Sequence, residues 1–170
     1  MSSDAPFDPV TQLADAPTER HTDAGPWSSH WRVLTPHMRA AGGKLGVVHN
    51  TLPPGAVGCP LHWHTLEDEV FFVLSGRGRL RYGDEVRDVG PGDCISCPAG
   101  RQVAHQLGNP FDDDLVYLAI GPYEPHEVCG YPDNGKVMVR SLQAVGRLES
   151  RDYMDGEPDP PLILDLPLTD

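Results

Sequence analysis

Short apolar runs, each closed by glycine or proline within a few residues, form the main pattern along the chain. Such runs predict β-strands, because strands are short and are ended by these two residues. No segment has the sustained 3.6-residue periodicity of a long amphipathic helix. The runs expected to form strands are KLGVVHNTL (44–52), PLHWH (60–64), EVFFVLSG (69–76), CISC (94–97), VAHQLGN (103–109) and DLVYLAIGP (114–122).

Two dipeptides mark hairpin turns between further strands. Gly83-Asp84 separates GRLRY (78–82) from EVRDV (85–89), and Asn134-Gly135 interrupts EVCGYPDNGKVMVR (127–140). Dipeptides of this kind are typical of tight turns between antiparallel strands. Roughly nine strands at a spacing of 8–12 residues predict an all-β fold, either a sandwich or a jelly-roll barrel.

Composition divides the chain into a barrel and two arms. Residues 1–26 are rich in Pro, Asp, Ser and Thr and predict a flexible or partner-docking N-terminal arm, and residues 27–145 are expected to hold the barrel. Residues 146–170 form a proline-rich C-terminal arm that includes EPDPPLILDLPL. Because exposed apolar residues need a partner surface, we expect a homodimer in which an arm crosses to the second copy.

The net charge excludes some partners. At −12, the chain repels nucleic acid and anionic membrane surfaces, and no basic stripe offsets this. No apolar run is long enough for a signal peptide or a membrane span. We therefore expect a cytoplasmic protein that binds a small molecule. Its four cysteines, Cys59, Cys94, Cys97 and Cys129, are then expected to be reduced thiols.

The chemistry lies in PLHWHTLEDEVFFVLSG (60–76), where histidines and acids abut the most apolar run. His62 and His64 are two residues apart on an extended segment, so their rings project to the same side. A turn at 65–68 returns Glu69 beside them, and His105 follows in a separate strand. Two imidazoles and a carboxylate can hold a metal with open positions for substrate. From the residues alone, Glu67 is an alternative to Glu69.

The spacing of these residues resembles the cupin superfamily. The first cupin motif, His-x-His, four residues, Glu, six residues, Gly, is matched by His62, His64, Glu69 and Gly76. The second, Gly, five residues, Pro-x-Gly, a short gap, His, three residues, Asn, is matched from Gly92 through PAG (98–100) and His105 to Asn109. The resemblance covers about residues 44–121. One departure is a gap of four residues, RQVA, before His105, where the family usually has two.

The resemblance implies a single double-stranded β-helix, a jelly-roll barrel with extended arms. It also implies one divalent transition metal per chain (Fe, Mn, Ni, Co, Cu or Zn) held by His62, His64, Glu69 and His105. Downstream segments resemble single-domain cupins that mostly lack an assigned reaction. Cys59 is close enough in sequence to approach the metal.

Three readings remain open from the sequence, the last of which is a purely structural barrel. The first is a small-molecule metalloenzyme, either a dioxygenase or a sugar or carbohydrate isomerase or epimerase. The second is a metal- or ligand-binding or sensing domain without turnover. Proton-transfer chemistry needs a base or acid beyond the ligands. The side chains considered for catalysis, none of them compelling, are Glu67, Tyr82, Arg101 and His126.

Overall fold

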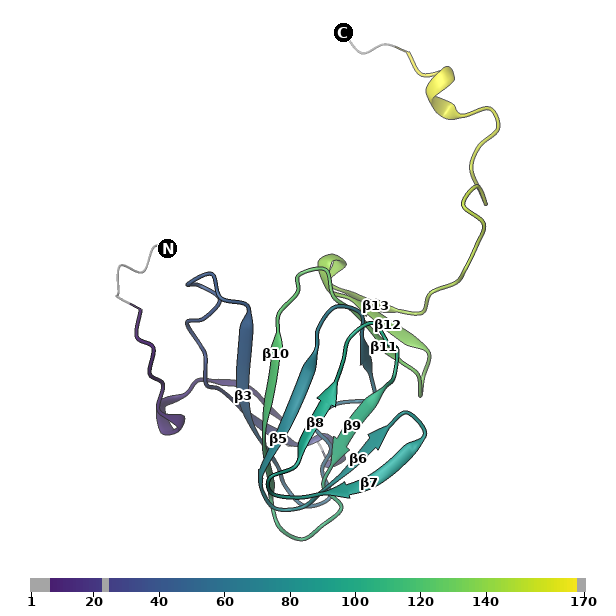
Figure 1. Ribbon diagram of the computed structural model, residues 1–170. Coiled ribbons are helices and arrows are strands. Elements are labelled where there is room, and N and C mark those ends of the chain that lie inside the picture. The colour runs from purple at the N-terminus through teal and green to yellow at the C-terminus, as the bar shows by residue number, and fades with distance from the viewer. Residues whose placement is uncertain (1–6, 23–24, 168–170) are drawn as a thin grey trace.

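The computed structural model describes residues 7–22 and 25–167 and shows, over those residues, thirteen β-strands and four short 3₁₀-helices without an α-helix. The largest sheet has six strands, and its order places strands distant in sequence side by side (Figure 1). In spatial order these are β1 (Thr18–Thr22), β2 (Ser29–Val33), β3 (Leu45–Leu52), β10 (Leu115–Pro122), β5 (Glu69–Ser75) and β8 (Cys94–Cys97).

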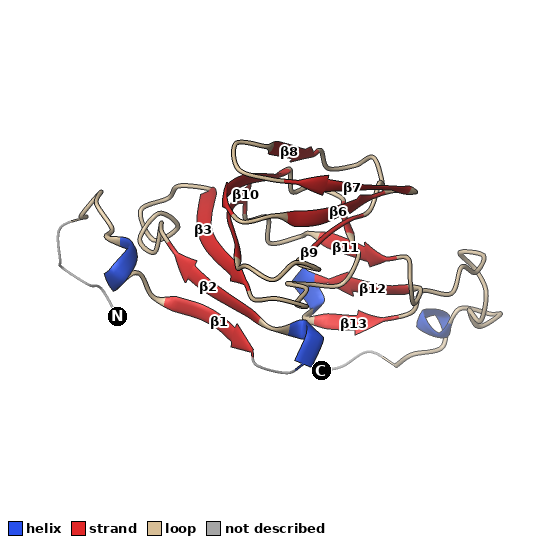
Figure 2. Ribbon diagram, turned by 90° about the horizontal axis from the view of Figure 1, so that it is seen from below, coloured by secondary structure: helices blue, strands red, loops and turns tan. Residues whose placement is uncertain are grey.

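Two smaller sheets complete the barrel. A backbone bridge between His62 and His105 joins them edge to edge, and together they face the larger sheet (Figures 1 and 2). One has the order β13 (Ala144–Gly146), β12 (Lys136–Val139), β11 (Val128–Tyr131) and β4 (Trp63–His64). The other has the order β7 (Glu85–Val89), β6 (Gly78–Tyr82) and β9 (His105–Gly108). The 3₁₀-helices are η1 (Leu13–Asp15), η2 (Gly25–Trp27), η3 (Arg140–Leu142) and η4 (Leu162–Leu164).

Strand alternation builds the core between these layers. In β5, Phe71 and Val73 point inward and are buried, whereas Phe72 and Leu74 point outward and are exposed. Each fully buried side chain of this size stabilises the fold by about 1.5–3 kcal/mol. The inward residues of several strands pack into one cluster, which is Leu52, Ala56, Phe71, Val73, Leu80, Val89, Ile95, Cys97, Leu107, Leu115 and Tyr117.

The all-β barrel predicted from the sequence is confirmed, and both hairpins are present. Tyr82 pairs with Glu85 across the Gly83-Asp84 turn, where Gly83 has a φ of +58° that favours glycine. Tyr131 pairs with Lys136 across the turn that contains Asn134 and Gly135. The N-terminal segment differs from the expected arm, because residues 18–22 form edge strand β1 paired with β2. This pairing depends on a partner strand that local composition does not reveal.

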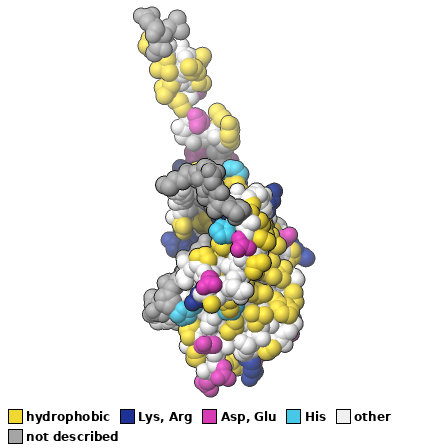
Figure 3. Space-filling view, turned by 90° about the vertical axis from the view of Figure 1, so that its left-hand side faces the viewer, with side chains coloured by type: hydrophobic (Ala, Val, Ile, Leu, Met, Phe, Trp, Pro, Cys, Tyr) yellow, Lys and Arg dark blue, Asp and Glu magenta, His cyan; other side chains and the backbone are white. Residues whose placement is uncertain are grey.

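The C-terminal segment leaves the barrel after β13 and extends away from it (Figure 1). Every described residue from 147 to 167 is exposed, and hydrophobic side chains line the projecting segment in the space-filling view (Figure 3). Leu162, Ile163 and Leu164 are 67–72% exposed. These side chains have no apolar surface of their own barrel against them.

We expect the protein to be a homodimer whose C-terminal arm packs on the second copy. Burying three large apolar side chains contributes several kcal/mol, so removing residues 151–170 should weaken dimerisation on the order of a hundredfold. Light scattering coupled to size-exclusion chromatography at micromolar concentration measures this. A monomeric mass for the full chain would contradict the expectation, as would a truncated chain that stays dimeric.

Candidate metal centre

The four residues of the two sequence motifs come from three strands. His62 directly precedes β4, which contains His64, while His105 begins β9 and Glu69 begins β5 of the opposite sheet. The backbone amide of His62 donates to the carbonyl of His105 at 3.2 Å, and the amide of His105 donates to the carbonyl of His62 at 2.8 Å. His105 therefore lies beside His62 and not across the barrel from it, and the longer loop before it leaves it buried.

The side chains of these residues converge on one carboxylate oxygen. Oε2 of Glu69 lies 2.8 Å from Nε2 of His105, 3.6 Å from Nε2 of His64 and 3.9 Å from Nε2 of His62. All four ligand atoms lie within 4.8 Å of one another. Three imidazole nitrogens surround one carboxylate oxygen, and this is the set of donor atoms expected of a metal site.

The hydrogen bonding of two histidine nitrogen atoms shows whether a cation fits this cluster. Nε2 of His64 is buried and has no hydrogen-bond partner among the described residues, which is costly unless something binds it. Nδ1 of His62 lies 2.9 Å from the carbonyl oxygen of Pro60. That contact holds the proton on Nδ1 and leaves the lone pair of Nε2 directed at the cluster. The residues present therefore fit a divalent transition metal.

Burial and mutual contacts shift the pKa values of the cluster strongly. Burial and the neighbouring His105 lower the pKa of His62 to about 4. For His64, burial lowers the pKa, but the Cys129 thiol and the Glu69 carboxylate outweigh it and raise the pKa to about 10. For Glu69, burial raises the pKa, but the hydrogen bond from His105 and the nearby His64 ring bring it down to about 2. Without metal at pH 7, Glu69 is therefore charged, His62 neutral and His64 protonated.

Metal binding at pH 7 is expected to release about one proton, because His64 must lose its proton to become a ligand. Since the pKa of His64 is about 10, raising the pH from about 6 to 9 should strengthen metal binding by removing the competing proton. Isothermal titration calorimetry in two buffers of different ionisation enthalpy counts the released proton. A binding enthalpy that is the same in both buffers would contradict this expectation.

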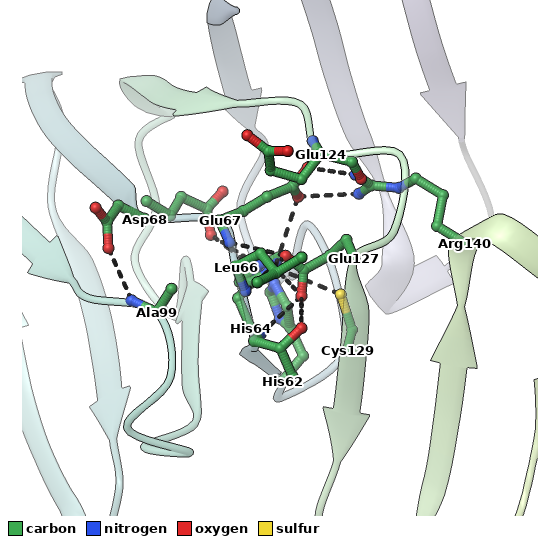
Figure 4. Close-up of polar contacts among 12 residues, drawn as sticks. His62, His64, Leu66, Glu67, Asp68, Ala99, Glu124, Glu127, Cys129 and Arg140 are labelled. Atoms are coloured by element: carbon green, nitrogen blue, oxygen red, sulfur yellow. Dashed lines mark hydrogen bonds and ion pairs between the residues drawn. The ribbon is translucent and has the colours of Figure 1, made fainter.

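A buried carboxylate that the sequence reasoning missed, Glu127, fixes the turn between His64 and Glu69. Its side chain is fully buried. It accepts hydrogen bonds from the amides of Thr65 at 2.7 Å, Leu66 at 2.9 Å and Glu67 at 2.8 Å, and from the Thr65 hydroxyl at 2.9 Å (Figure 4). The turn that returns Glu69 to the histidines is thus held by the residue that directly precedes β11, the strand that pairs with β4.

Glu67, weighed above as a ligand and as a catalytic residue, is paired with Arg140 instead. The guanidinium of Arg140 donates to both carboxylate oxygens of Glu67, and the amide of Glu124 donates to Oε1 of Glu67 at 2.6 Å (Figure 4). The hydrogen bond to Glu67 raises the pKa of Arg140, against a smaller effect of burial. A bidentate pair of this kind orients both side chains.

The metal cluster opens into a cavity of about 330 Å³ inside the barrel. Its wall is mixed, with apolar side chains such as Phe71 and Met138 beside polar ones. The polar side chains that line it, apart from the four cluster residues, are Trp31, Asn50, Gln106, Tyr117, Tyr131 and Arg140, together with the thiols of Cys59 and Cys129. A cavity with few, converging polar groups around a metal cluster is a typical small-molecule site.

The remaining residues weighed for catalysis are not brought to this cavity. Tyr82 packs against the core and lines a separate surface pocket, and Arg101 and His126 are exposed residues outside the cavity lining. Cys59 does approach the centre, with its sulfur 4.0 Å from Nδ1 of His62. Cys129 lies closer still, 3.4 Å from Nδ1 of His64.

Strand parity is the one sequence signal that would have pointed to the missed residues. Glu127, Cys129 and Tyr131 alternate along the same side of one segment, so placing any one of them inside the barrel places all three there. Which side faces inward is decided by the pairing of β11 with β4, where Cys129 lies opposite His64.

Comparison with known proteins agrees with the fold and with the position of the cluster residues. The cupin domain family model matches residues 48–121, which contain all four cluster residues. A sugar phosphate isomerase of the cupin superfamily from Silicibacter pomeroyi is 26% identical, with a TM-score of 0.70 over 88% of this chain and 96% of its own. The protein thus carries a cupin domain. In this cupin, the possible metal site is the His/Glu cluster that the two motifs define.

Other relatives show how widely the fold is used. The polyketide cyclase RemF from Streptomyces resistomycificus shares the fold with this cupin at 21% identity, with a TM-score of 0.58 over 69% of this chain and 81% of its own. An uncharacterized protein of Streptomyces coelicolor is 38% identical over 58 residues, which is 34% of this chain. The match spans about half, 53%, of that curated relative. No helix among the described residues is long and apolar enough to cross a membrane.

Proposed function

We propose that this cupin is a metal-dependent enzyme that isomerises a small, sugar-like substrate. The observation that carries the proposal is the joint one of a three-histidine, one-carboxylate cluster and a cavity of about 330 Å³ that opens onto it. The polar wall of that cavity suits a hydroxylated molecule. The Silicibacter pomeroyi relative, a sugar phosphate isomerase, supports the same reaction class.

The cluster residues hold the metal, and the wall residues position the substrate. A divalent ion bound there would polarise a carbonyl or enediol oxygen as a Lewis acid. Burial is the main cause that raises the pKa of Tyr117 and of Tyr131, so both phenols stay protonated near neutral pH. Each can then donate a hydrogen bond to a substrate oxygen. Phe71 and Met138 exclude water from the same space.

The proposal is tested by following isomer interconversion in deuterated water by proton NMR. The full chain, loaded separately with Mn, Fe, Co, Ni and Zn, is incubated with paired aldoses and ketoses, each in neutral and phosphorylated form. Proton transfer predicts interconversion with solvent deuterium in the product. The Glu69→Gln variant should lose turnover, and Glu149→Gln, which changes a carboxylate exposed on the C-terminal arm, should keep it.

Two other results of this assay would replace the proposal. Oxygen consumption by the iron form in the presence of a substrate would favour a dioxygenase, because a histidine and carboxylate cluster with open positions also suits oxygen chemistry. Saturable ligand binding without turnover under any metal would favour a sensing or binding domain.

A further inference from the structure

A second hollow adjoins the metal centre at one end of the barrel. It has a volume of about 470 Å³, and its lining shares Val48, Glu69 and Ala119 with the main cavity. Glu69 belongs to the metal cluster. The two spaces therefore meet beside a metal ligand, and a substrate longer than the main cavity has somewhere to extend.

A pair of glycines forms the floor of this hollow. Gly46 of β3 and Gly121 of β10 are partners in the sheet, and they share the inward parity of Val48 and Ala119. A Cβ on Gly121 would lie 2.8 Å from the carbonyl oxygen of Asp68, a distance that real side chains do not adopt. Only glycine fits Gly121 without a shift in the backbone, because the backbone of Asp68 packs directly over this position.

Two positively charged side chains lie at the rim of this hollow. Arg39 and Lys44 line the hollow and belong to the segment that connects β2 to β3. The amide of Tyr123 donates to the carbonyl of Lys44 at 3.1 Å, and the guanidinium carbon of Arg39 lies 3.5 Å from the centre of the Tyr123 ring. The end of β10 thus holds both residues in place, although the chain as a whole carries a charge of −12.

These cations are available to a ligand. Among the side chains of residues 7–18 and 25–167, Arg39 has no carboxylate partner, and its guanidinium contacts the Tyr123 ring. Nζ of Lys44 lies 3.9 Å from Oε1 of Glu124, but the Lys44 side chain is 80% exposed, so the pair is weak. Arg140, the cation inside the main cavity, is already paired with Glu67. The arginine and lysine side chains with free charge for an anionic ligand therefore lie at the rim and not in the cavity.

We propose that the rim groove, formed by Arg39, Lys44, Gly46, Gly121 and Tyr123, binds an oxyanion carried by the substrate, a phosphate or a carboxylate. This rests on the proposed function, since the reacting end of the same substrate lies at the metal centre. A guanidinium presents paired N–H groups that match two oxyanion oxygens, and a nearby ammonium adds a compact charge.

The test locates anion binding directly. Full-length protein loaded with zinc, which is diamagnetic, is titrated with inorganic phosphate and separately with acetate, while backbone amides are followed by NMR. We expect saturable shifts at the amides of Gly46, Gly121 and Tyr123. Arg39→Gln and Lys44→Gln should each weaken binding about tenfold. Arg87→Gln removes the same charge from β7, in another sheet, and should leave the affinity unchanged.

The relative affinity of the two probes identifies the anion. Tighter binding of phosphate indicates a phosphorylated substrate, and tighter binding of acetate indicates a sugar acid. The inference is overturned if the three amides do not shift, if Arg87→Gln weakens binding as much as Arg39→Gln, or if the shifts are confined to His62 and His105 and vanish with the zinc. The last result would mean that phosphate binds the metal itself.

Failure of this inference and failure of the proposed function give different results. Turnover that prefers neutral sugars and is unaffected by Arg39→Gln would reject the groove and keep the isomerase. Groove binding that Arg39→Gln weakens, in a protein that turns over nothing, would keep the groove and reject the isomerase. Metal content is measured on every variant, and Arg39→Gln should leave it unchanged because Arg39 is not a member of the metal cluster.

Discussion

Removing the metal with a chelator at neutral pH is expected to lower the melting temperature by about 10 °C. A ligand that binds only the folded state stabilises it by about 4 kcal/mol at a thousandfold excess over its dissociation constant. For a chain of this size each kcal/mol shifts the melting temperature by about 2–4 °C. The cluster residues come from three strands, so the unfolded chain cannot present them together. Differential scanning calorimetry beside a metal assay on the same sample makes the measurement.

Two variants separate this effect from ordinary destabilisation. Glu69→Gln should bind little metal and should show almost no further change on chelation. Leu115→Ala removes a fully buried core side chain and should cost about 2–5 kcal/mol, yet it should keep the full drop on chelation. A wild-type sample that carries one metal per chain and melts at the same temperature after its removal would contradict the coupling of metal to folding.

Glu127→Ala is expected to destabilise the protein by about 4 kcal/mol and to weaken metal binding 10- to 100-fold. The substitution leaves the amides of Thr65, Leu66 and Glu67 without their acceptor, and each unsatisfied buried donor costs about 1–3 kcal/mol. The same amides hold the turn that connects His64 to Glu69, and loss of such supporting contacts typically costs metal affinity on this scale. Urea unfolding and metal titration measure the two effects.

Repeating the urea unfolding experiment at acidic pH checks whether Glu127 is charged in the folded protein. Burial raises its pKa, but hydrogen bonds from Thr65 and Leu66 prevail and lower the pKa below the ordinary 4.5. A lowered carboxyl pKa adds stability above pH 4.5, and this stability is lost as the pH falls through the folded-state pKa. Glu127→Gln should flatten this part of the stability profile, whereas Glu149→Gln, exposed and paired with the exposed Arg151, should not. If the stability of Glu127→Gln fell at acidic pH as that of the wild type does, this role of the Glu127 charge would be contradicted.

The sequence by itself determined the fold class and the identity of the cluster. Period-two alternation is a local property, so the strand at 69–76 and its inward Phe71 and Val73 follow from residue order alone. The two-residue spacing of His62 and His64 likewise settles that both rings project to one side of a strand. The hairpin at Gly83-Asp84 was predictable for the same reason, because two neighbouring residues make the turn.

Only the tertiary structure decided what surrounds that cluster. Glu127 acts on Thr65 from 62 residues away, and Arg140 pairs with Glu67 across 73 residues. No local periodicity encodes contacts at such separations, because they depend on which strands become neighbours. The register of β3 against β10, which sets Gly46 opposite Gly121 in the rim groove, is of the same kind. Residue types and their alternation supply the ligands, while strand pairing places them and shapes the space in which they act.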